Sequence, residues 1–133
     1  MPTRTLNDFE GAWTLRRFIT HASGAEAEFR GTATWTPDDQ GRLRCSEDGL
    51  LKVGQGAPVT ARQTYLWEDG LRVHFSDGRF FHTVPASGGD ASHWCDPDQY
   101  DGAYDFSDWP KWTVTWRVLG PRKDYTLRSA YSR

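Results

Sequence analysis

The chain has 133 residues, a mass of 15.2 kDa and a net charge of −2, from 16 basic and 18 acidic side chains. This length allows one domain with a single core (residues 1–133) and excludes a second domain. Without a net positive charge, electrostatic binding of nucleic acid or of an anionic membrane is not expected. Seven Trp, five Tyr and seven Phe residues favour a β-rich fold over a helix bundle.

Residues 1–7 contain no apolar segment of the kind found in signal peptides, and no stretch approaches the ~18 apolar residues of a membrane span. We therefore expect a soluble cytoplasmic protein with no membrane partner. Cys45 and Cys95 are expected to be free thiols, as is usual in a reducing compartment, with a disulfide as the less favoured alternative. The sequence gives no indication of the oligomeric state.

Alternation of apolar and polar residues, interrupted by turn sequences, runs through most of the chain, and no helical 3.6-residue stripe is found. Over residues 13–19 and 27–35 the apolar face lies at the odd-numbered positions. The same parity continues over residues 43–53 and 59–67. This pattern predicts eight to ten short antiparallel strands.

The dipeptide Asp77-Gly78 is the strongest turn signal in the chain, because it is typical of a two-residue type I′ hairpin. A turn of this type fixes the register of the strands on either side. It would place Phe75 opposite Phe80 on the apolar side, and Phe81 on the other side.

Two further turn sequences predict hairpins. Residues 68–70 (Glu-Asp-Gly) fit a three-residue loop that would pair Trp67 with Leu71. Residues 120–123 (Gly-Pro-Arg-Lys) would form the last hairpin loop. On one side this last hairpin would place Trp112, Val114, Trp116, Val118, Tyr125, Leu127, Ser129 and Tyr131.

Strands of this kind close into an up-and-down barrel or form a sandwich. Because sequential hairpins need no long crossover connections, we predict an all-β fold with a single antiparallel up-and-down β-barrel of 8–10 strands. Small inward residues such as Gly31, Ala33 and Ala61 suit the taper of a barrel.

Residues 9–13 (Phe-Glu-Gly-Ala-Trp) resemble the Gly-x-Trp opening of lipocalins and other calycins. In those barrels the Trp closes one end and stacks under an Arg of the last strand. The resemblance assigns these places to Trp13 and Arg133.

Four longer segments resemble a bacterial family of calycin-like, lipocalin-like small barrels, catalogued as domain of unknown function 6314. They are Arg62-x-x-Tyr65, Phe75-x-Asp77-Gly78-Arg79-x-Phe81-His82, His93-x-Cys95-x-x-Asp98-x-Tyr100 and Trp116-x-x-x-Gly120-Pro121-x-Lys123-Asp124-Tyr125. The resemblance implies a calycin-like barrel. It implies no settled activity, because barrels of this kind include both carriers and enzymes.

Several polar side chains fall on strand faces that are otherwise apolar. Burying such groups costs several kcal/mol unless they are paired or solvated, so we expect them to converge on one another, on water or on a ligand. The predicted ligand-binding residues are Arg17, Glu47, Gln63, Tyr65, His82, His93, Tyr100, Trp116 and Tyr125. The alternative is an Arg17–Glu47 ion pair that closes a solid core.

The preferred function is the binding of a small amphipathic anion, of an acyl, aromatic or tetrapyrrole-like class, with Arg17 holding its acidic group. The second hypothesis is a small calycin-type isomerase, cyclase or lyase in which His82 or His93 moves a proton. The third is a protein-interaction module with exposed Trp94 and Trp109, which would need a solid interior. No catalytic residue is assigned.

The segment 90–109 differs from the rest, with six Asp, five aromatic residues and no Lys or Arg. It is interpreted as a lid over the cavity or as an acidic strand connection. The glycine and terminal glutamate of an EF-hand are missing. His93-x-Cys95 supplies only one pair of soft ligands, to which His82 is a conceivable third, so we predict no metal and no cofactor. Nucleophile elbows and phosphate loops are also missing.

Overall fold

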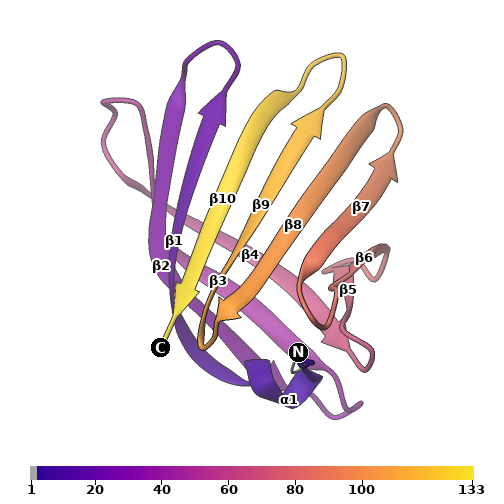
Figure 1. Ribbon diagram of the computed structural model, residues 1–133. Coiled ribbons are helices and arrows are strands. Elements are labelled where there is room, and N and C mark those ends of the chain that lie inside the picture. Colours follow the sequence, from indigo (N-terminus) through magenta and orange to yellow (C-terminus); the bar gives the residue numbers. More distant parts are fainter. Residues whose placement is uncertain (1–2) are drawn as a thin grey trace.

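The computed structural model describes residues 3–133 and contains one ten-stranded antiparallel sheet preceded by the short helix α1 (Leu6–Phe9). The strands are β1 (Gly11–His21), β2 (Glu26–Pro37), β3 (Leu43–Val53), β4 (Val59–Glu68), β5 (Arg72–Phe75), β6 (Phe80–Thr83), β7 (Gly89–Cys95), β8 (Asp98–Asp108), β9 (Lys111–Leu119) and β10 (Asp124–Ser132). Their order in the sheet is β6-β5-β4-β3-β2-β1-β10-β9-β8-β7. The sheet curls into a nearly closed barrel (Figure 1), which confirms the predicted all-β, up-and-down architecture.

The barrel is left open along one seam. Strands β6 and β7 are the two edges of the sheet, and no ladder joins them in the part of the chain from residue 3 onward. The His93 ring of β7 lies 5.3 Å from the ring of Phe81 and 6.0 Å from that of Phe75. Side chains therefore pack across the seam where the backbones do not pair.

One end of the barrel is closed by aromatic side chains beneath α1. Phe9 is fully buried, and its ring lies 5.0 Å from that of Trp67, 5.3 Å from Trp109 and 5.4 Å from Trp112. Such tilted and edge-on contacts between rings add to the burial of their large apolar areas. Trp109 is thus part of this plug and not an exposed docking residue.

The Gly-x-Trp resemblance is confirmed at the same end. The Trp13 indole donates from Nε1 to the Phe9 carbonyl oxygen at 2.8 Å. The Arg133 guanidinium lies over Trp13, with Cζ 3.9 Å from the ring centroid. It also donates to the carbonyl oxygens of Glu10 (2.6 Å) and Asp8 (2.8 Å). The last residue of the chain therefore ties the end of β10 to the N-terminal segment.

The predicted register holds in the last hairpin and differs in the one between β4 and β5. Tyr131 pairs with Trp112, as expected for β9 and β10. Trp67 pairs with Val73 rather than with Leu71, because Leu71 itself lies in the loop with a φ of 57°. The slip amounts to two residues, so the same side chains still face inward.

A bulge between Val73 and His74 overturns the predicted pairing of Phe75 with Phe80. Val73 pairs with His82 as expected, but Phe80 pairs with His74 and is 47% exposed. An odd shift exchanges the two faces of a strand. Phe81, which was expected to face outward, therefore lines the interior.

The segment 90–109 is neither a lid nor a loose connection, since most of it forms β7 and β8 in the barrel wall. Its inward positions include the buried Tyr104, and its aspartates lie mainly on the outer side. The two thiols are not bonded to each other, and Cys45 is buried while Cys95 is exposed. Between residues 3 and 133 no helix is long and apolar enough to cross a membrane.

Candidate functional site

The barrel holds a cavity of about 280 Å³ that reaches the plug residue Trp67. Gln63 and Cys95 are the exposed residues of its lining and mark where it meets solvent. The interior is therefore hollow. This disagrees with the hypothesis of a protein-interaction module, which required a solid interior. Sites for drug-sized ligands typically start at ~300 Å³, so this cavity suits a compact molecule. Eight of the nine predicted site residues line it, namely Arg17, Glu47, Gln63, Tyr65, His82, Tyr100, Trp116 and Tyr125.

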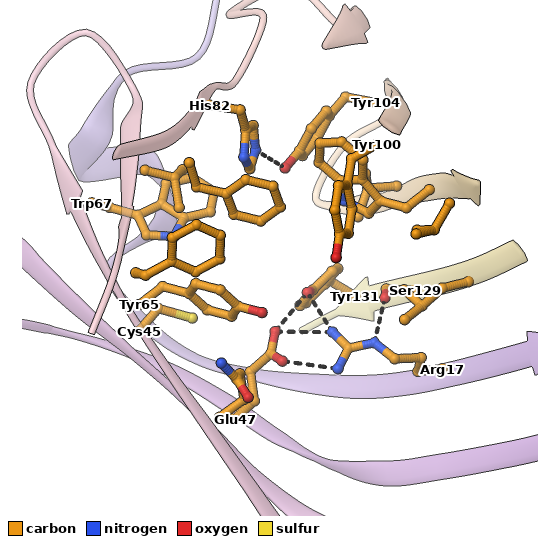
Figure 2. A pocket seen from close by; sticks show the side chains of 18 of the residues that line it. Arg17, Cys45, Glu47, Tyr65, Trp67, His82, Tyr100, Tyr104, Ser129 and Tyr131 are labelled. Carbon is orange, nitrogen blue, oxygen red and sulfur yellow. Dashed lines mark hydrogen bonds and ion pairs between the residues drawn. The ribbon is translucent and has the colours of Figure 1, made fainter. Parts of the chain in front are cut away.

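A polar cluster on β1, β3 and β10 forms one wall of the cavity (Figure 2). Arg17 faces Glu47 with two contacts, Nη1 to Oε1 at 2.9 Å and Nη2 to Oε2 at 3.1 Å. Its Nε donates to Ser129 Oγ at 2.7 Å. The Tyr131 hydroxyl donates to Glu47 Oε2 at 2.9 Å. The ion pair that was weighed as the alternative is thus present, but it borders a cavity instead of closing a solid core.

This pairing determines the charge of the cluster. Burial opposes the charged form of Arg17, but its interactions with Tyr131 and Glu47 outweigh that effect and raise the pKa of Arg17 above its ordinary value. Glu47 is 3% exposed, so its charge has little contact with water. A buried ion pair of this kind has no net charge. The charge of Arg17 is already neutralised by Glu47, so Arg17 is not an unpaired cation for an anionic ligand.

The phenols around the cluster are neutral hydrogen-bonding groups. Burial, followed by the charge of Glu47, raises the pKa of Tyr65 and of Tyr131 above the usual value. Burial also raises the pKa of Tyr104. The Tyr65 hydroxyl points toward the centre of the cavity beside Glu47 (Figure 2), and no protein partner within residues 3–133 binds it. It can therefore donate to a bound molecule or accept from it.

His82 lies on the opposite wall and is held by Tyr104. Its Nε2 is 2.7 Å from the Tyr104 hydroxyl oxygen. Burial, with a smaller effect of His93, lowers the pKa of His82 from 6.5 to about 3. The imidazole is thus neutral at physiological pH. A general base works best with a pKa near the operating pH, so the environment of His82 does not favour proton transfer.

His93, the ninth predicted ligand-binding residue, is not among the described residues that surround the cavity. Its half-buried ring fills the seam between β6 and β7 against Phe81. Burial and the nearby charge of Arg79 lower the pKa of His93, against the opposing effect of the Phe81 backbone. Because no backbone ladder joins β6 and β7 in the described part of the chain, the His93 ring can occupy the seam between them.

The open end of the cavity carries a second neutral pair. Lys123 Nζ is 3.0 Å from Asp98 Oδ2 and donates to the Tyr100 hydroxyl at 3.0 Å. These hydrogen bonds raise the pKa of Lys123 above its ordinary value. Tyr125 and the exposed Cys95 complete this edge. The mouth therefore offers polar contacts without an unpaired cation.

Sequence reasoning missed several lining residues, chiefly Phe81, Tyr104, Ser129 and Tyr131. The face shared with Tyr125 was sufficient to find Ser129 and Tyr131. The bulge concealed Phe81, and the interpretation of residues 90–109 as a lid concealed Tyr104. Within the described chain, no group of three or more His, Cys, Asp or Glu residues is arranged to hold a metal ion.

A scan against family models finds a match over residues 9–133 to the family described as "Family of unknown function (DUF6314)". The chain belongs to this family. No curated protein gives a significant match. The fold and the family are thus established, but neither identifies a ligand for this protein.

Solved structures with a similar fold include an S-type phycobiliprotein lyase from Guillardia theta, with 10% identity and a TM-score of 0.70 over 96% of this chain and 89% of that one. A protein of unknown function of the DUF3598 family from Nostoc punctiforme has 15% identity and a TM-score of 0.58, over 98% and 49%. A redesigned β-barrel bound to DFHBI has 14% identity and a TM-score of 0.47, over 98% and 100%. The first two likenesses show that the fold is shared with the lyase and with the DUF3598 protein.

Proposed function

We propose that this protein is a binding barrel for a small, mainly aromatic or conjugated molecule. The observation that carries the proposal is a cavity of about 280 Å³ with aromatic walls and one buried polar cluster. Pockets of this kind, mostly apolar with a few placed polar groups, are typical of small-molecule sites. The rings of Phe75, Phe81 and Trp116 form a stacked wall, with centroids 4.6 and 5.2 Å apart.

The size of the cavity bears on the ligand classes predicted from the sequence. A compact ring system fits a volume of about 280 Å³, whereas an entire tetrapyrrole would project through the mouth. A flexible acyl chain would gain little from the flat surfaces of Phe81 and Trp116, which favour stacking. Among the predicted classes, the aromatic one is the best supported.

The amphipathic character of the predicted ligand also fits, because the apolar wall faces the Arg17–Glu47 cluster. Its predicted acidic group is supported less well. An acid that binds Arg17 would compete with Glu47, which is already held by contacts of 2.9 and 3.1 Å. Displacement would leave one of the two carboxylates buried without a counter-ion.

Catalysis by an isomerase, cyclase or lyase in the same cavity is the less favoured candidate. His82 has a pKa of about 3, and His93 does not reach the cavity. The likeness to a phycobiliprotein lyase rests on 10% identity and speaks for the fold. Binding without turnover is therefore the function that the geometry supports best.

A fluorescence titration with the neutral probe N-phenyl-1-naphthylamine tests the proposal. Gln63 is exposed and borders the cavity, so Gln63→Trp fills the opening at little cost to the core. Arg62→Trp adds the same indole on the outer side and is the matched control. We expect saturable binding that Gln63→Trp weakens at least about tenfold, or ~1.4 kcal/mol, while Arg62→Trp leaves it unchanged. Equal affinities for all three proteins would contradict an interior site.

A further inference from the structure

Three completely buried polar atoms on cavity-lining side chains have no hydrogen-bond partner within the described part of the chain. They are Glu47 Oε1, His82 Nδ1 and Trp35 Nε1. The three residues are only 3%, 4% and 1% exposed, respectively. Buried polar atoms in folded proteins are nearly always paired with protein, water or ligand. Their unused hydrogen-bonding capacity therefore indicates which hydrogen-bonding groups a ligand of this cavity would carry.

The two oxygens of Glu47 differ in their surroundings. Oε2 accepts from Arg17 Nη2 at 3.1 Å and from the Tyr131 hydroxyl at 2.9 Å. Oε1 lies 2.9 Å from Arg17 Nη1, but that ion-pair contact lacks hydrogen-bond alignment. A carboxylate oxygen can only accept hydrogen bonds, so the group that satisfies Oε1 must be a donor.

The charges around the cavity define this donor further. Glu47 is compensated by Arg17, and Lys123 at the mouth is compensated by Asp98. Burial keeps Cys45, Tyr65 and His82 neutral, since it raises the pKa of Cys45 and Tyr65 and lowers that of His82. A ligand anion would be desolvated with no free counter-ion, beside a carboxylate. A ligand cation would meet a carboxylate that Arg17 has already neutralised.

We propose that the ligand of this barrel is an uncharged aromatic molecule whose buried end is an O–H or N–H group that donates to Glu47 Oε1. This inference rests on the proposed function and narrows its ligand class, from any aromatic molecule to phenols, indoles, lactams and related neutral donors. It also replaces the acidic end group predicted from the sequence. Arg17 then acts as a positioning residue that holds Glu47 in place.

Matched probes test this on the wild-type protein, where folding is not at issue. Competition against N-phenyl-1-naphthylamine would give the affinities of 2-naphthol, 2-methoxynaphthalene and 2-naphthoate. The three share one ring system and differ in carrying a neutral donor, an acceptor only, or an anion. Hydrogen bonds to charged groups are strong enough that we expect 2-naphthol to bind about tenfold more tightly than either of the others. Hydrophobicity alone would favour the ether, which has one more carbon.

The variant Glu47→Gln tests the role of the carboxylate. It leaves Arg17 as an uncompensated cation, so 2-naphthoate should gain at least about tenfold over 2-naphthol. If Glu47→Gln does not fold, the order of the three probe affinities for the wild-type protein still tests the proposal. Tighter or equal binding of 2-methoxynaphthalene or 2-naphthoate by the wild type overturns this inference alone. Failure of every probe, N-phenyl-1-naphthylamine included, overturns the proposed function instead.

Discussion

Arg17 and Glu47 are 30 residues apart in the chain and meet inside the barrel, with N···O distances of 2.9 and 3.1 Å. Strand β2 separates their strands in the sheet, so curvature of the barrel brings the two side chains together. Tyr131 and Ser129 bind the same pair from β10. The interior is thereby polar at one place and neutral in charge. The prediction on stability that follows, and the ligand class proposed above, both rest on this pair.

Breaking the pair from one side should be more harmful than removing it. Arg17→Met leaves the Glu47 carboxylate buried and uncompensated, which costs about 3–5 kcal/mol in the free energy of unfolding. The double variant Arg17→Met/Glu47→Leu removes both charges and should be more stable than Arg17→Met. Urea denaturation of the three proteins measures this order. A double variant no more stable than Arg17→Met would contradict it.

His82 should make the folded protein sensitive to acid. Its pKa is about 3 when folded and near 6.5 when unfolded, so between these values the unfolded chain binds the extra proton. Stability is therefore lost as pH falls from 6.5 toward 3, by at most ~1.4 kcal/mol per pH unit. In His82→Gln this contribution disappears. As pH is lowered from 6.5 toward 3, the urea midpoint of His82→Gln should therefore decrease less steeply than that of the wild type. The exposed His21→Gln serves as control and should follow the wild type.

Arg133 should contribute to stability although it is the last residue. Its guanidinium stacks on Trp13 at 3.9 Å and donates to two backbone carbonyl oxygens. We expect Arg133→Ala to reduce the free energy of unfolding by about 1–3 kcal/mol, from the lost cation–π contact and hydrogen bonds. Arg128→Ala, at an exposed position in β10, should change it by less than ~0.5 kcal/mol. Equal thermal midpoints for both variants would disprove the role of Arg133.

Gly31 should not tolerate a side chain. It pairs with Gly49 across β2 and β3, and a Cβ at position 31 would lie 2.1 Å from the Asp48 carbonyl oxygen. Because the obstacle is backbone, we expect Gly31→Ala to destabilise the fold by about 3 kcal/mol, the upper range for overpacking. Gly56→Ala, in the β3–β4 loop and 3.1 Å from its nearest neighbour, is the control. Similar melting temperatures for Gly31→Ala and Gly56→Ala would contradict this prediction, because they would show that β2 and β3 can move apart to admit the methyl group.

Much of the fold follows from strand parity and turn chemistry. The pairing of Trp112 with Tyr131 and the inward face of β1 were predictable, because alternation is strong there and the turns are tight. Eight of the nine predicted residues line the cavity for the same reason, since polar groups on an apolar face converge when a sheet closes. The slip at Leu71 did no harm, because a shift of two residues preserves the faces.

The predictions from sequence fail where an irregularity of the backbone determines which side chains face the cavity. The bulge at Val73 exchanges Phe80 for Phe81, and a single-residue insertion leaves no trace in alternation. The open seam, which takes His93 away from the cavity, depends on which strands fail to pair. That Glu47 compensates Arg17 was weighed as an alternative, but parity places both on the inner side without giving their distance.

Isotope-filtered NMR of the protein with bound N-phenyl-1-naphthylamine can show where the probe lies. We expect intermolecular contacts from the probe to the methyl groups of Val114, Val118 and Leu127 inside the cavity. Contacts confined to outward apolar groups such as Phe18, Leu50 and Trp94 would contradict an interior binding site.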